Sequence, residues 1–238
     1  MARKQQTRGE CVFCRREMAK GGLTRHLKSC PARQETIAAA NAGGGKNEAL
    51  YHLQVLDAWS GDYWLHLEMR GDATLNDLDS YLRVIWLECC GHLSAFSIGP
   101  YRYTQLFDDG WAVGDEKDMA VKVARLFRPG MEIPYEYDFG TTSELVIKVV
   151  DVRKGRPLTP NPIFLMARNK MSAFICQECG QPAEWLCIEC IYEHDEPGLL
   201  CKAHADEHEH EAYGGPMPLV NSPRVGMCGY VGPAEPPY

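Results

Sequence analysis

The chain has 238 residues, 45% of them hydrophobic, and a net charge of −7. This length accommodates one sizeable core and one or two small modules, and the composition excludes a wholly disordered protein. No stretch approaches the roughly 20 apolar residues of a membrane span, and the first residues lack the apolar segment of a secretory signal. The sequence therefore predicts a cytoplasmic protein without a membrane partner.

Charge is distributed unevenly along the chain. Residues 1–33 contain nine Lys/Arg and two Glu, so the rest of the chain must carry −14 to give the net charge of −7. A basic head, residues 1–33, therefore precedes an acidic remainder of the chain.

The basic head contains the pattern Cys11-x2-Cys14-x11-His26-x3-Cys30. In this pattern a knuckle presents two thiolates, and a helix presents His26 and Cys30 four residues apart on one face. Met18 and Leu23 fall where such a finger keeps its small apolar core. The spacing predicts a CCHC-type zinc finger over residues 1–32, with Cys11, Cys14, His26 and Cys30 as ligands.

Basic side chains on this finger attract phosphate. Sequence-specific reading is disfavoured, because Gly21 and Gly22 occupy early helix positions that contact bases in DNA-reading fingers. We expect the finger to contact DNA or RNA without sequence readout, or a protein bound to it; the alternative is a solvated basic face. The candidate nucleic-acid-binding residues are Arg15, Arg16, Lys20, Arg25 and Lys28.

Small residues and a glycine run follow, and they predict a flexible linker over residues 33–46 with at most a short helical start. Alternating apolar residues then predict a hairpin of strands 51–55 and 63–69, and Thr74 is a good N-cap for a helix over 75–88. The pattern further predicts strands at 92–98, 101–103, 133–139 and 145–152, an apolar run at 163–167, and a helix from Asp118 to Phe127. This order predicts an α+β central domain with an antiparallel sheet over residues 47–170.

Four segments of this domain are distinctive. They are Tyr63-Trp-Leu-His-Leu-Glu-Met69, Thr74-Leu-Asn-Asp-Leu78, His92-Leu-Ser-Ala-Phe96 and Tyr135-Glu-Tyr-Asp-Phe-Gly140. Together they resemble the plasmid Ri "open reading frame three"-like family, a plasmid or transposon passenger also labelled TnpR-like. The resemblance covers about residues 48–168 and implies a compact α+β fold with a curved antiparallel sheet and packed helices. It supplies no catalytic residue.

The chain departs from that family after Gly140. The family often continues with Asp and then Trp, whereas this chain reads Thr141-Thr-Ser-Glu-Leu145, so any role of that pair does not transfer. The alternation of Tyr135, Tyr137 and Phe139 favours packing of a strand face over ligand contact.

A second Cys/His cluster lies in residues 171–238 and offers eight ligands, enough for two zinc ions. In B-box and RING-like cross-braces, the first and third ligand pairs along the chain bind one zinc ion, and the second and fourth pairs bind the other. We assign the ligands here in the same way. One set is Cys176, Cys179, Cys201 and His204, and the other is Cys187, Cys190, His208 and His210. Cys228 and His194 are rivals for the place of His210.

Four protein ligands leave no position for water, so these zinc ions are expected to be structural. Residues 176–211 contain ten Asp/Glu and only Lys202, a charge that repels nucleic acid and suits a protein contact. From Gly214 the chain is rich in Gly and Pro and is expected to run as an extended strap.

Two catalytic alternatives fit poorly. A deaminase would combine His66-x-Glu68 with Cys187-x2-Cys190, but the Pro of that motif is missing. Thioredoxin-like chemistry would need a βαβ context. We therefore predict a non-enzymatic adaptor stabilised by three zinc ions. The alternatives are a protein-protein interaction module, or an enzyme with a pocket near His92, Tyr135, Tyr137 and Asp138.

Overall fold

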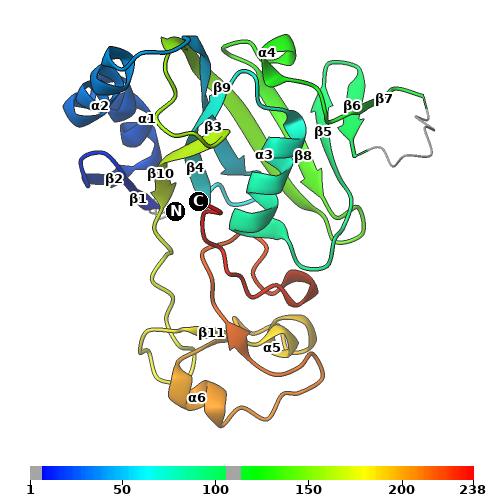
Figure 1. Cartoon of the computed structure of the whole chain (residues 1–238). Helices are drawn as coiled ribbons and strands as arrows, with labels where there is room; N and C mark the ends of the chain where they lie inside the picture. Colours follow the sequence, from blue (N-terminus) through cyan, green and yellow to red (C-terminus); the bar gives the residue numbers. More distant parts are fainter. Residues whose placement is uncertain (1–6, 106–113) are drawn as a thin grey trace.

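The computed structural model describes residues 7–105 and 114–238. A ten-stranded sheet in the order β2-β1-β10-β4-β3-β9-β8-β5-β6-β7 forms the body, and every adjacent pair except β6 and β7 is antiparallel (Figure 1). The α+β class with a mainly antiparallel sheet is thus confirmed. The strands are β1 (Arg8–Cys11), β2 (Glu17–Ala19), β3 (Glu48–Asp57), β4 (Trp64–Arg70), β5 (Ser94–Ile98), β6 (Tyr101–Thr104), β7 (Glu116–Asp118), β8 (Glu132–Tyr137), β9 (Ser143–Gly155) and β10 (Ile163–Asn169).

Two extended segments connect a smaller module to the body (Figure 1). It contains the three-stranded sheet β12-β11-β13 and two short helices. Its elements are β11 (Trp185–Leu186), β12 (Leu199–Leu200), β13 (Met217–Pro218), α5 (Ile188–Glu193) and α6 (Lys202–Asp206). The body helices are α1 (Lys20–Ser29), α2 (Pro31–Ala42), α3 (Leu75–Leu82) and α4 (Val123–Leu126).

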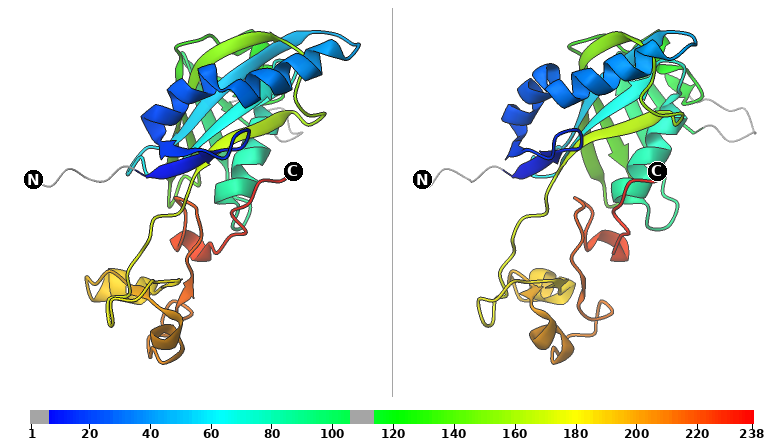
Figure 2. Two further views of the ribbon diagram at one scale, coloured as in Figure 1. Left: turned by 90° about the vertical axis from the view of Figure 1, so that its left-hand side faces the viewer. Right: turned by 60° about the vertical axis from the view of Figure 1, so that its left-hand side comes forward.

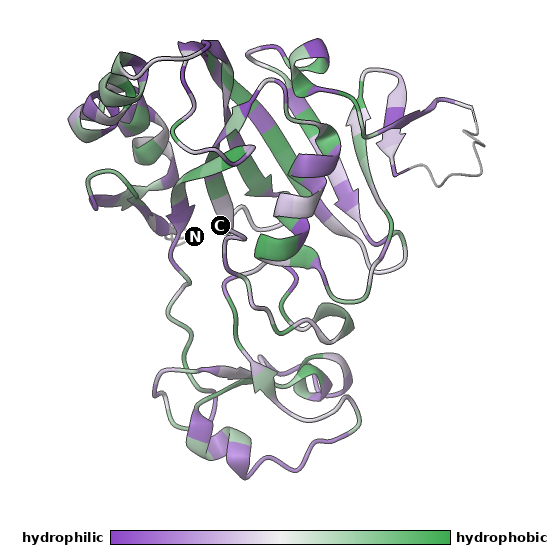
Figure 3. Cartoon of the chain, viewed as in Figure 1, coloured by the Kyte–Doolittle hydropathy of each residue, from purple (hydrophilic) through white to green (hydrophobic). Residues whose placement is uncertain are grey.

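Both faces of the body sheet are covered, because helices α1 and α2 lie on one face and α3 on the other (Figure 2). Side chains alternate along a strand, so Leu65 and Leu67 of β4 join the core beneath α3. Trp64 points to the opposite face and packs with Leu23 and Leu27 of α1. Apolar residues are concentrated in the body, whereas the small module is mostly hydrophilic (Figure 3).

Helix α3 begins where its sequence requires. The Thr74 side chain accepts from the Asp77 amide and the Asp77 carboxylate accepts from the Thr74 amide, which completes a capping box. After Leu82 the chain continues in a π-helical turn, Arg83–Leu87. That turn delivers Cys89 and Cys90 to the end of the sheet nearest the small module.

Two local expectations were wrong. The expected flexible linker over 33–46 is helical up to Ala42, because Pro31 sits in the first turn and an alanine-rich run follows. Asp118 does not begin a helix; it ends β7, which pairs with β6, and α4 spans only Val123–Leu126. In the linker, the helix propensity of the alanine-rich run outweighed the signal of the glycines. At Asp118, pairing of β7 with β6 outweighed the helical spacing of the residues that follow.

The buried carboxylate of Asp79 connects α3 to the sheet. It accepts from Arg83 Nε at 2.6 Å, Ser94 Oγ at 2.5 Å and the Tyr135 hydroxyl at 2.7 Å. Asp79→Ala removes the buried acceptor shared by Arg83, Ser94 and Tyr135 and leaves Arg83 only the more exposed carboxylate of Glu88, so we expect it to lower the free energy of unfolding by about 3–5 kcal/mol. Asp72→Ala, at an exposed ion pair with Arg70, should cost less than about 1 kcal/mol. Urea denaturation of both variants checks this, and equal midpoints would contradict it.

No helix in the described part of the chain is long and apolar enough to cross a membrane.

Candidate metal centres

The first Cys/His group lies at the edge of the body sheet. Strands β1 and β2 form a hairpin whose knuckle carries Cys11 and Cys14, and α1 carries His26 and ends at Cys30. One ligand atom from each of these four residues lies within 4.8 Å of the others, with Cys14 Sγ 3.2 Å from His26 Nε2. The knuckle closes through the Arg15 amide, which donates to the Cys11 carbonyl at 2.8 Å.

The pKa values of Cys11 and His26 are those expected for side chains that need, or can accept, a bound metal ion. Burial raises the pKa of the Cys11 thiol to about 11, so its proton is readily lost only when a positive ion compensates the thiolate. Burial, and then the charge of Arg16, lower the pKa of His26. The imidazole is therefore neutral at physiological pH, which is the form that binds metals.

This ββα unit is part of the body rather than a tethered finger. Strand β1 pairs with β10 through Gly9 and Asn169, Glu10 and Arg168, and Cys11 and Ala167. Leu23 and Leu27 of α1 are fully buried in a cluster with Trp64 and Met166. Gly9 permits this pairing, because a Cβ there would lie 2.2 Å from the Arg168 carbonyl oxygen.

The basic residues of this unit divide into two sets. Arg15 pairs with Glu10 at 3.0 Å, and Lys20 donates to the Gly61 carbonyl at 3.0 Å. Arg16, Arg25 and Lys28 are exposed, and within residues 7–105 and 114–238 they have no ion pair with an acidic group. Three of the five candidate contact residues are thus available to a polyanion.

The small module gathers the eight other predicted ligands into two groups. Cys176, Cys179, Cys201 and His204 form one, with Cys179 Sγ 3.8 Å from Cys201 Sγ and Cys201 Sγ 3.3 Å from His204 Nδ1. Burial opposes ionisation of the Cys176 thiol, but amide hydrogen bonds from Cys201, Cys179 and Glu178 outweigh it and lower its pKa to about 6. Such N–H to sulfur bonds stabilise a thiolate ligand.

Cys187, Cys190, His208 and His210 form the other group. Cys190 Sγ lies 3.3 Å from both His208 Nε2 and His210 Nδ1. His194 stacks on the His210 ring at 4.7 Å between centroids and approaches Glu189, so it lies beside this group. Cys228, the other rival of His210, lies instead against the body, near Cys90.

All three groups have the dimensions of a tetrahedral zinc site. Zn–S bonds of about 2.3 Å and Zn–N bonds of about 2.05 Å place neighbouring sulfurs about 3.8 Å apart and sulfur about 3.6 Å from nitrogen. The distances above are 3.8 Å between sulfurs and 3.2–3.3 Å between sulfur and nitrogen. The donor sets, three sulfurs with one nitrogen or two with two, are those of structural zinc. The residues therefore fit this metal.

The His66-x-Glu68 pair has a different role from the one a deaminase needs. His66 Nδ1 lies 2.8 Å from His52 Nε2, and Glu68 binds Arg153 and Arg33. These polar groups line the sheet beneath α1 and α2, and no ligand cluster of the described residues includes His66. The structure thus does not bring His66 and Glu68 to the Cys187 and Cys190 pair with which a deaminase site would combine them.

The residues proposed for an enzymatic pocket also have structural partners. Tyr135 donates to buried Asp79. Tyr137 and Asp138 lie beside Cys89 and His92, respectively, at the end of the sheet. Sequence reasoning missed that Cys89 and Cys90 lie there with Cys228; the available signal was that Cys89, Cys90 and Cys228 fall outside the recognised pairs.

Comparison with known proteins gives a family but no activity. Residues 50–194 match the family described as "Plasmid pRiA4b ORF-3-like protein". A crystal structure of MM3350 from Methanosarcina mazei Go1, a protein of unknown function, is similar with a TM-score of 0.43 and 16% identity over 56% of this chain and 75% of that one. This likeness is too weak to carry an argument. No protein of curated function matches significantly.

Proposed function

Because the chain belongs to the plasmid pRiA4b ORF-3-like family, whose description names no activity, we propose from its own side chains a zinc-binding, non-enzymatic adaptor that contacts nucleic acid. In this proposal the first group and the two groups of the small module each hold one zinc ion through the residues described above. Four protein ligands close each ion to water and substrate, so the metal would stabilise structure rather than catalyse.

The observation that carries the nucleic-acid contact is the exposed basic face of the first unit, defined here as Arg16, Arg25 and Lys28. Arg25 and Lys28 are three residues apart and share one side of α1. Arg16 approaches the same helix closely enough to lower the pKa of His26. Because α1 is packed on the sheet, the backbone that carries Arg25 and Lys28 is ordered before binding, so a phosphate contact costs only the freedom of the side chains.

The contact is expected to lack base specificity. The start of α1 carries Gly21 and Gly22, and Lys20 beside them is bonded to the Gly61 carbonyl of the β3–β4 loop. That loop lies against the end of the helix that would enter a major groove. The small module, with ten acidic residues between positions 176 and 211, should face away from the polyanion.

Salt dependence tests this function. Three phosphate contacts predict that log K for a random-sequence DNA duplex falls with log salt with a slope of about −3, and Arg25→Ala with Lys28→Ala should reduce the slope by about 2. Arg125→Ala removes an exposed cation on α4 and should leave the slope unchanged. Fluorescence anisotropy at several salt concentrations measures this. A slope insensitive to the double substitution, or no binding at low salt, would refute the proposed contact.

A further inference from the structure

A fourth Cys/His group joins the C-terminal strap to the body. Cys89 and Cys90 follow the π-helical turn after α3, and His92 stands just before β5. Cys228 comes from a 3-10 turn in the strap, Met227–Gly229, 136 residues beyond His92. One ligand atom from each of the four lies within 4.8 Å of the others.

The distances within this group fit one ion. Cys90 Sγ lies 3.7 Å from Cys89 Sγ and 3.6 Å from Cys228 Sγ, close to the roughly 3.8 Å between sulfurs in a tetrahedral zinc site. His92 Nε2 lies 3.5 Å from Cys228 Sγ, close to the roughly 3.6 Å between sulfur and nitrogen in such a site, and 2.9 Å from Cys90 Sγ, a pair that a bound ion would separate further. Three thiolates and one imidazole repeat the donor set of the first group.

Cysteine usage in the whole chain supports this assignment. With this group included, each of the eleven cysteines belongs to one of four Cys/His groups of four residues. A protein without metal would have no reason to place three sulfurs and a ring nitrogen from two distant segments at one point. Sulfurs that are 3.6–3.7 Å apart are also too distant to be disulfides, whose bond is about 2.05 Å.

The surroundings suit a negatively charged zinc–thiolate centre. Three thiolates and Zn²⁺ sum to −1, and the buried Arg224 guanidinium lies 3.4 Å from Cys89 Sγ. Asp138 holds that guanidinium at 2.6 Å and lies 3.4 Å from His92. Tyr137 contacts Cys89 through its hydroxyl. Arg224 and Tyr137 are outer contacts that orient Cys89. Asp138 acts through Arg224, because its contact with His92 is to Nε2, the nitrogen that faces the sulfurs.

We propose that Cys89, Cys90, His92 and Cys228 hold a fourth, structural zinc ion, which ties the strap to the body. The strap is also bonded to the body through Ser222, whose hydroxyl donates to the Trp86 carbonyl at 2.6 Å. Asn169 Nδ2 donates to Asn221 Oδ1 at 2.8 Å, so the two segments that connect the small module to the body lie side by side at one point, the neck. The fourth ion fixes the chain beyond this neck and does not depend on the proposed nucleic-acid contact.

Native mass spectrometry of the full-length reduced protein tests this site. We expect four zinc ions per chain, and three in the variant carrying Cys90→Ser and Cys228→Ser. His92→Cys supplies another zinc ligand and should keep four. Ser222→Ala, the matched control, loosens the strap without removing a ligand and should also keep four. The double variant should bind one ion fewer than the unaltered protein whatever the occupancy of the other three groups, so failure of this site is distinguishable from failure of those sites.

Alkylation of the unaltered protein gives a second readout that requires no variant to fold. Cys90 and Cys228 are exposed, so free thiols there would react quickly with iodoacetamide. Bound to zinc, both should be protected, and a chelator should abolish the protection. An equal zinc count in the unaltered protein and the double variant, or rapid alkylation of both cysteines in the metal-loaded form, would overturn the proposal.

Discussion

Replacing Cys11 by Ser is expected to destabilise the whole body by several kcal/mol, on the order of 5, and not only the basic unit that contains it. Cys11 is fully buried, and its strand β1 pairs with β10. Helix α1, which carries His26, packs against Trp64 of the body. Burial of Leu23 and Leu27 is worth about 1.5–3 kcal/mol each, and a structural zinc ion contributes further folding energy. A loss of this size approaches the total stability of many domains.

Urea denaturation followed by tryptophan fluorescence, to which buried Trp64 and Trp86 of the body contribute, measures this effect. Arg16→Ala is the control, because it alters the same knuckle at an exposed position and should change the free energy of unfolding by less than about 0.5 kcal/mol. Because serine is itself a polar group in a buried position, the unaltered protein with a chelator is a second comparison, and its unfolding transition should also move to lower urea. An unchanged transition in both experiments would mean that this group contributes nothing to the body.

The second large effect is local unfolding of the small module when its ions are lost. Its apolar cluster is small, comprising Cys187, Cys190 and Leu200 with Trp185 and Ala205 against it. Units below about 40 residues usually require a metal or disulfides to fold. Cys187→Ser should therefore unfold residues 176–218, while the body remains folded because the strap is anchored separately at Ser222 and Arg224.

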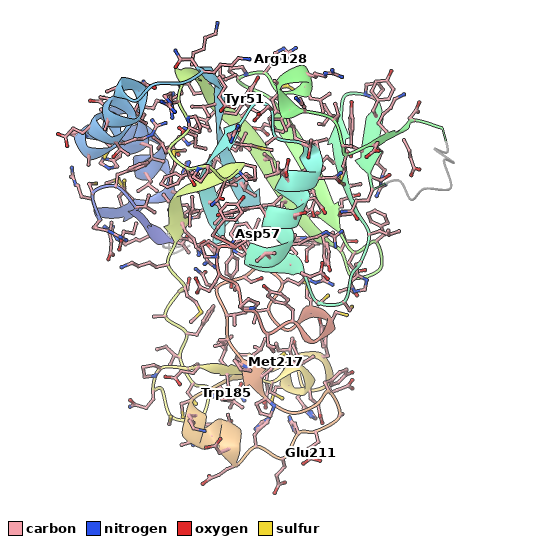
Figure 4. All side chains as sticks on the ribbon, in the orientation of Figure 1. Tyr51, Asp57, Arg128, Trp185, Glu211 and Met217 are labelled. Carbon is pink, nitrogen blue, oxygen red and sulfur yellow. The ribbon has the colours of Figure 1, made fainter. Side chains whose placement is uncertain are left out.

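Hydrogen exchange with mass spectrometry locates this change. Amides of the module should exchange at nearly the rate of an unfolded chain in Cys187→Ser, and those of β3 and β9 should stay protected. Figure 4 shows Trp185 and Met217 inside the module and Glu211 at the end farthest from the body. Glu209→Gln, between two ligand histidines but exposed, is the control and should retain full protection. Loss of protection in the body would contradict independent folding.

Local patterns indicated much of this structure. The N-cap at Thr74 and the β3–β4 hairpin are confirmed, because their signals lie within a few residues of each other. Short-range spacing also singled out twelve candidate ligand residues that the structure gathers into three groups.

Long-range contacts could not be read from such patterns. Nothing near β1 indicates that it pairs with β10, about 155 residues away, so the basic unit was expected to be tethered. The fourth group was missed for the same reason: Cys89-Cys90-Gly91-His92 has no familiar spacing, and its last member comes from the strap. The Asp138 of the distinctive Tyr135–Gly140 segment likewise acquires its partner, Arg224, only when the strap folds back.

The central claim is that these Cys/His groups hold zinc. X-ray absorption at the zinc edge of the purified protein tests it most directly, because it reports the ligands of the bound metal. Four occupied groups predict eleven sulfur and five nitrogen ligands shared among four ions, with sulfur at about 2.3 Å and nitrogen at about 2.05 Å. A first shell made only of oxygen or nitrogen, or a protein without bound zinc whose cysteines form disulfides, would contradict the account.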